Sequence, residues 1–193
     1  MKTRKIASGP DRIAAVSVFL VAVCIFLGAV ISFRASPGRF LSFEDALQGI
    51  NLGTVQFSRS IKKALFAHLV YTFSVIVFSS GFPMSFLPGI IILAKSFVLG
   101  TVAGLAARCC VMPDVLGIFF SIFISNVLIL PVYVLMFISG INYSIKILEG
   151  ALSPSSSCGE FFRFVFKMTV FFGILAAAEC LQTATGVMIL KLF

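Results

Sequence analysis

Two charged residues lie inside long apolar segments of this sequence, Lys95 and Glu179. A charge near the centre of a bilayer costs at least about 2.5 kcal/mol, so such residues normally face protein or a water-filled cavity and are paired. At 1.5 Å per helical residue, Lys95 lies about 10 Å and Glu179 about 16 Å into their segments, a difference that a lysine side chain mostly spans. We predict that the two approach each other and hold two helices together. Three roles are open to such a pair: a structural contact between helices, part of an ion path, or a contact with a partner protein. The remaining alternative is that Lys95 snorkels to the membrane interface and Glu179 is protonated.

A second polar position is Asn126, five residues before Pro131 in the same apolar segment. Pro131 should kink the helix and leaves a carbonyl one turn earlier without its amide partner. Asn126 is therefore predicted to satisfy freed backbone groups or to bond to another helix, and the alternative is a substrate ligand.

Small residues recur at helical spacing in two segments. Gly100 and Gly104 form a GxxxG motif, which lets two membrane helices approach closely. Gly173 and Ala177 are predicted to play the same part in the last apolar segment.

The sequence contains little that indicates catalysis or metal binding. The three aspartates lie near or outside the predicted membrane boundaries, whereas an intramembrane aspartyl protease needs two within them. The single histidine, His68, has no convincing base or nucleophile partner and is predicted to be a polar tip at the membrane interface. The sequence contains no Walker loop, HExxH or dinucleotide motif, and no two cysteines have zinc-site spacing. We expect no enzyme, no cofactor and no metal site.

The composition indicates where these residues must be positioned. Of the 193 residues, 60% are hydrophobic and 11% are charged, against about 25% charged in a soluble domain. Such a chain cannot cover a core with polar surface, which excludes a water-soluble enzyme, a disordered chain and a nucleic-acid-binding domain. The net charge of +8 is attributed to lysines and arginines at helix ends.

The apolar segments predict an all-α, polytopic membrane helix bundle, with residues 1–193 as one domain. About 20 apolar residues span a bilayer as a helix. The glycine- and proline-rich segment 79–89 predicts a tight turn, residues 146–167 a polar loop, and the stretch 34–63 an amphipathic surface helix. The five predicted transmembrane helices, joined mostly by short connections, are residues 13–33, 64–80, 89–107, 116–138 and 168–190.

The orientation of the chain follows only weakly from charge. The segments on the two sides of the membrane each hold seven basic residues. Because the first helix usually dominates the positive-inside rule, we expect a multi-pass protein of the cell membrane with a cytoplasmic N-terminus.

Three segments in this order resemble the stage II sporulation protein M family of bacterial and archaeal membrane proteins. They are PGIIILAKSFVLGTVAGLAA, SNVLILPVYV and AAAECLQTATGVMI. The resemblance covers nearly the whole chain and implies a fold of five to six spans. The positions that match the family pattern are Lys95, Gly100, Gly104, Asn126, Pro131 and Glu179.

The resemblance implies a non-enzymatic scaffold. In spore-formers, such a protein recruits two cell-wall enzymes, the stage II sporulation proteins D and P, during engulfment. The expected partners are therefore membrane lipid and other membrane or envelope proteins, such as cell-wall hydrolases, with an oligomer left open. The alternative from the residues themselves is a small-solute or ion permease component that uses Lys95, Asn126 and Glu179 along a path.

Overall fold

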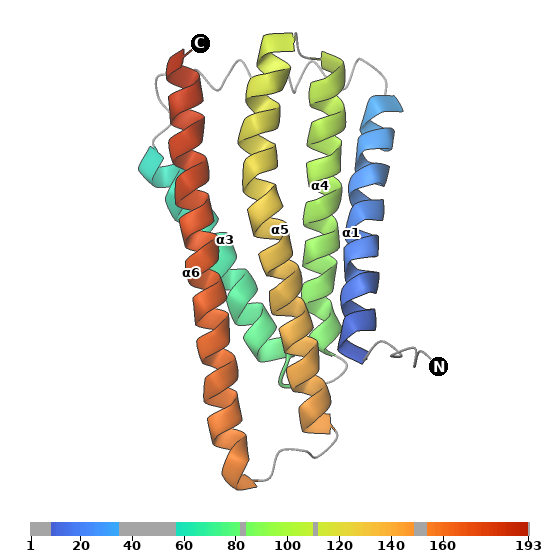
Figure 1. Cartoon of the computed structure of the whole chain (residues 1–193), viewed down its shortest axis with the longest axis vertical. Helices are drawn as coiled ribbons and strands as arrows, with labels where there is room; N and C mark the ends of the chain where they lie inside the picture. Colours follow the sequence, from blue (N-terminus) through green and yellow to red (C-terminus); the bar gives the residue numbers. More distant parts are fainter. Residues whose placement is uncertain (1–8, 35–56, 82–83, 110–111, 149–153, 193) are drawn as a thin grey trace, which may run out of the picture.

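The computed structural model describes residues 9–34, 57–81, 84–109, 112–148 and 154–192. These residues form helices and turns without any strand, which confirms the all-α prediction. The elements are α1 (Gly9–Arg34), α3 (Phe57–Phe78), the short 3-10 helix η2 (Met84–Phe86), α4 (Leu87–Cys109), α5 (Met112–Leu148) and α6 (Pro154–Leu192) (Figure 1).

Five of the described helices are long and apolar enough to cross a membrane, as the sequence predicts. Successive long helices alternate in direction, so the two termini lie at opposite ends of the bundle (Figure 1). This arrangement is compatible with a multi-pass membrane protein. The candidate spans are Arg12–Arg34, Ile61–Phe78, Met84–Leu105, Leu128–Leu148 and Cys158–Leu181.

The predicted polar loop at residues 146–167 is wrong for 146–148 and 154–167, which are helical, and its residues 149–153 lie outside the described residues. Helix α5 continues to Leu148 and α6 already begins at Pro154, a residue that suits the first turn of a helix. The two helix ends pack together, because the rings of Tyr143 and Phe164 stack with centroids 4.4 Å apart and an interplanar angle of 2°. Hydropathy misses this extension because the charged residues lie on the helix surface, where they do not interrupt packing.

The turn predicted between the second and third spans is confirmed. The chain leaves α3 through a turn in which the amide of Ser80 donates to the carbonyl of Val77, and the amide of Ser85 donates to Gly81 at 3.2 Å. Of the predicted surface helix in 34–63, residues 35–56 lie outside the described residues, and the chain is helical in α3 from Phe57 onward.

Helix α5 lies at the centre of the bundle. It contacts α1, α3, α4, α6 and η2, and 56% of its membrane window is buried, against 6% for α1. Because lipid tails are as apolar as these side chains, burial of this face stabilises the bundle through dense van der Waals packing between the helices. The buried hydrophobic residues of α5 are Ile129, Leu130, Val132, Tyr133, Val134, Met136, Ile141 and Tyr143.

The GxxxG motif of α4 packs against α1. A Cβ on Gly100 would collide with the backbone of Ile25, and a Cβ on Gly104 would collide with Ala29. Both pairs are 75 positions apart, so the two helices run in parallel with a constant register. The contact is reciprocal, because a Cβ on Gly28 of α1 would meet the backbone of α4.

The prediction that Gly173 and Ala177 form a similar packing surface is wrong. Both residues are exposed, and a Cβ on Gly173 would meet nothing within 4 Å among the described residues. The spacing of small residues shows only that close approach is sterically allowed; whether another helix lies there depends on the arrangement of the bundle.

Gly100→Ala should destabilise the protein by about 1–3 kcal/mol, because the added methyl meets backbone atoms that cannot rotate away. Gly173→Ala is the matched control. It should be neutral or stabilising by up to about 1 kcal/mol, since alanine favours helix and the site is open. Unfolding in mixed micelles with increasing denaturing detergent measures both. Equal effects of the two substitutions would contradict the α1–α4 contact.

Candidate functional site: a polar cluster shared by four helices

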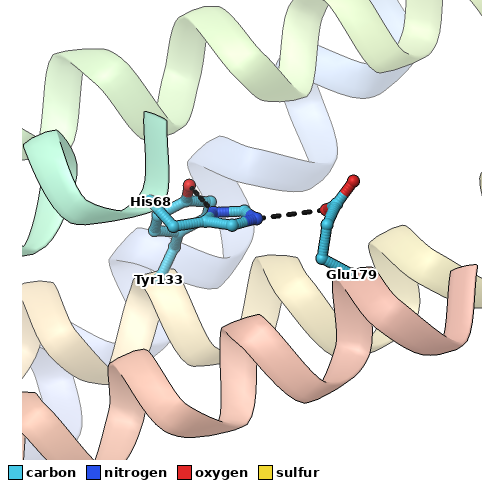
Figure 2. Close-up of polar contacts among 3 residues, drawn as sticks. All are labelled: His68, Tyr133 and Glu179. Atoms are coloured by element: carbon cyan, nitrogen blue, oxygen red, sulfur yellow. Dashed lines mark hydrogen bonds and ion pairs between the residues drawn. The ribbon is translucent and has the colours of Figure 1, made fainter. Parts of the chain in front are cut away.

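Four polar side chains from four different helices meet inside the bundle. They are His68 of α3, Lys95 of α4, Tyr133 of α5 and Glu179 of α6, and are called the polar cluster below. Figure 2 shows the imidazole of His68 lying between the Tyr133 hydroxyl and the Glu179 carboxylate.

His68 is the central residue of this cluster. Its Nδ1 lies 2.6 Å from the hydroxyl oxygen of Tyr133 and its Nε2 lies 3.1 Å from Oε2 of Glu179. The residue is only 2% exposed. The prediction of an interfacial polar tip is therefore wrong: both ring nitrogens have partners, from segments 65 and 111 positions away in the sequence.

The hydrogen-bonded chain can hold different numbers of protons. With a neutral imidazole, the Tyr133 hydroxyl donates to Nδ1, and the Nε2–H donates to the Glu179 carboxylate. With an imidazolium, both ring N–H groups donate, one to the phenol oxygen and one to the carboxylate. Each state satisfies both ring nitrogens with the heavy atoms in place.

Lys95 joins the cluster through the aromatic ring of Tyr133. Its Nζ lies 4.6 Å from the ring centroid, within the range of a cation–π interaction. Glu179 lies closer to His68, whose Nε2 is 3.1 Å from Oε2. Lys95 and Glu179 still attract each other electrostatically across the cluster.

The predicted direct contact between Lys95 and Glu179 is thus replaced by an indirect one. Among the described residues, α4 and α6 make no direct helix contact, because α3 and α5 lie between them. The structure brings the two charged residues into one cluster, but Tyr133 and His68 connect them. The four helices, rather than two, are held by these groups.

Neighbouring side chains orient the cluster. The ring of Tyr71 packs edge-on against that of Tyr133, with centroids 4.2 Å apart, and its hydroxyl donates to the Tyr133 carbonyl at 3.3 Å. The hydroxyl of Thr72 donates to the carbonyl of His68 at 2.8 Å. The spacing of His68, Tyr71 and Thr72 puts all three on one face of α3, and this polar face within an apolar span is the sequence signal that identifies the site.

The register of α1 against α4 indicates the depth of the cluster. The offset of 75 positions places Lys95 level with Leu20 of α1. Leu20 is three residues from the midpoint of the candidate span Arg12–Arg34, which corresponds to about 5 Å along the helix. His68 and Lys95 also lie close to the middle of their own candidate spans, Ile61–Phe78 and Met84–Leu105, whereas Glu179 lies near the end of Cys158–Leu181.

The remaining predicted positions, Asn126 and Pro131, both lie in α5. The helix continues through Pro131, whose side chain is exposed, and Asn126 is half-buried. Asn126 precedes Tyr133 by seven residues, two helical turns, and so shares its face of α5.

The chemistry open to this site is narrow. Because Tyr133 and Glu179 occupy both ring nitrogens, His68 is not oriented towards a serine or cysteine nucleophile. Within the described residues, no three histidine, cysteine or acidic side chains are grouped so that they could hold a metal ion. The site combines hydrogen bonding, charge pairing and proton binding.

Fold and site together define an all-helical bundle with five candidate membrane spans and a polar cluster shared by four of its helices. In comparisons with known proteins, no family model, no curated protein and no solved structure matches the chain. The resemblance to the stage II sporulation protein M family stays a prediction.

A double-mutant cycle should show that Glu179 couples to His68 more strongly than to Lys95. His68→Leu with Glu179→Met is expected to give a coupling of about 1–2 kcal/mol, since their hydrogen bond is direct. Lys95→Met with Glu179→Met is expected to give less, because these charges interact at longer range. Unfolding free energies in mixed micelles provide the values. The reverse order would contradict the observed connectivity.

Tyr133→Phe separates the hydroxyl from the ring. It should cost about 1 kcal/mol, because it removes one hydrogen bond while Lys95 keeps an aromatic face. Tyr133→Leu should cost about 3 kcal/mol, since the ring contacts are lost as well. Tyr143→Phe, which removes a hydroxyl outside the cluster, is the control. A similar loss for both Tyr→Phe variants in the same unfolding assay would show that the His68 hydrogen bond contributes nothing measurable.

Proposed function

We propose that this protein is a non-enzymatic multi-pass scaffold of the cell membrane that recruits other envelope proteins, including peptidoglycan-remodelling enzymes. The proposal rests mainly on the surface of α1. One narrow stripe of this helix packs on α4, and 6% of its membrane window is buried. A part of α1 also contacts α5, and the remaining surface, which is largely apolar, is open to a partner's membrane helices.

The polar cluster is consistent with such a role. Its charged and hydrogen-bonding groups contact one another across α3, α4, α5 and α6, so they stabilise a rigid bundle. A rigid bundle holds α1 in a constant position for recruitment. The resemblance to the stage II sporulation protein M family, whose members are expected to recruit cell-wall enzymes, supports the same conclusion.

We also propose that the N-terminus is cytoplasmic. Figure 1 places the start of α1 at the same end of the bundle as the end of α5 and the start of α6. This end carries four described basic residues, Arg12, Lys146, Arg163 and Lys167, against six at the opposite end, Arg34, Arg59, Lys62, Lys63, Arg108 and Lys191. The proposal therefore rests on the first helix, which usually dominates the positive-inside rule.

A second candidate function is a small-solute or ion permease component. His68 adds a third titratable group to Lys95 and Glu179, and linked histidine and carboxylate groups within membrane spans are typical of proton relays. Asn126, on the face of α5 that carries Tyr133, would extend the polar path by two turns. This candidate requires that the protein carry flux on its own.

The scaffold proposal predicts that the outer face of α1 determines partner capture. Phe19 and Phe26 are each 67% exposed and lie seven residues apart on one face. Replacing both with alanine should reduce co-purification of envelope proteins several-fold after mild crosslinking in native membranes. Phe73→Ala, at an equally exposed position of α3 (66%), is the control. Recovery of only lipid and general chaperones with the unchanged protein would contradict the scaffold.

The permease candidate is tested on the same preparations. Purified protein in liposomes with an internal pH-sensitive dye is compared with Glu179→Gln. A scaffold should show no flux above empty liposomes for either protein. Flux that disappears in a folded Glu179→Gln variant would favour the permease and overturn the scaffold.

A further inference from the structure

A groove lies where the first turns of α1 approach the end of α5 and the beginning of α6. Its volume is about 1070 Å³, and it is separate from the polar cluster. Ile13 of α1 forms one wall, and α5 and α6 form the other two.

The two long helices each contribute one stripe of residues to this groove. On α5 the stripe contains Ser139, Asn142 and Lys146; on α6 it contains Arg163 and Lys167. Spacings of three, four and seven residues place each set on one face of its helix. The groove is therefore a surface that the two helices build together.

Positive charge dominates the polar part of the groove. Lys146 lies 3.6 Å from Glu160, the one carboxylate in the lining, and the two partly neutralise each other. Arg163 and Lys167 have no carboxylate partner within 4.0 Å in the part of the chain that the structure describes. Both are exposed and one helical turn apart, so their charges add at one place.

The remaining lining is apolar. Phe166 and Val170 of α6 and Ile13 of α1 are part of it. Ile13 lines the same groove and is the second residue of the candidate span Arg12–Arg34, so the groove lies at the membrane boundary on the side of α1, where a lipid headgroup can reach Arg163 and Lys167.

We propose that this groove binds an anionic phospholipid. The phosphate lies between Arg163 and Lys167, and an acyl chain runs along Phe166, Val170 and Ile13. The charge favours this occupant, since three cations face one carboxylate and a zwitterionic lipid would bring its own cation. The combination of a cationic mouth and an apolar wall suits a lipid better than a free phosphate, because a free phosphate has no acyl chain to contact the wall.

The test measures lipid retention by native mass spectrometry of the full chain in detergent. The protein is incubated with equal amounts of phosphatidylglycerol and phosphatidylcholine. The unchanged protein should retain phosphatidylglycerol preferentially, and Arg163→Gln with Lys167→Gln should lower its affinity about tenfold. Lys62→Gln with Lys63→Gln, the same charge change on exposed positions of α3, should leave retention unchanged.

Two further measurements complete the test. Circular dichroism confirms that each variant keeps its helices, as expected because all four substituted side chains are exposed. Inorganic phosphate added in excess should not displace the lipid. Equal retention of the two lipids, an equal loss in both double variants, or displacement by inorganic phosphate alone would overturn the proposal.

Discussion

The polar chain from Tyr133 through His68 to Glu179, with Lys95 over the Tyr133 ring, is the interaction on which the arrangement of the helices depends. Each hydrogen bond between membrane helices contributes only about 1 kcal/mol. A charged side chain that loses its partner in a buried position costs far more, about 3–5 kcal/mol. The cluster itself therefore adds little stability. Its main effect is to raise the free energy of any arrangement of α3, α4, α5 and α6 in which its members are separated.

Helix α1 joins the bundle by a different mechanism. Its contact with α4 involves glycines on both helices, and the backbones approach until no Cβ can fit between them. Close packing of this kind depends on dispersion and fixes the register through shape. No charged group in the described part of α1 takes part in the polar cluster. Because the contact of α1 with the bundle is narrow, most of its apolar surface remains available to lipid or to another protein. In this molecule the polar cluster thus connects four helices, and close steric packing attaches the fifth.

The prediction errors have identifiable physical causes. The segment 146–167 was predicted as a loop because it contains charges and serines, yet Lys146, Arg163 and Lys167 lie on the surfaces of two helices that continue past the apolar core. His68 was predicted as an interfacial residue because nothing near it in the sequence can partner an imidazole; its partners lie 65 and 111 positions away. In both cases the feature depends on distant segments, so the local sequence does not determine it.

The sequence by itself determined the all-α class, the five apolar segments, the turn before η2, and the importance of Lys95, Glu179 and the GxxxG glycines. These follow from local physics, since hydropathy and helical periodicity depend on consecutive residues. Only the tertiary structure decided that Gly100 and Gly104 pack against α1, that Gly173 packs against nothing described, and that His68 and Tyr133 stand between Lys95 and Glu179. The physical reason is that α4 and α6 are kept apart by α3 and α5, an arrangement that no single helix encodes.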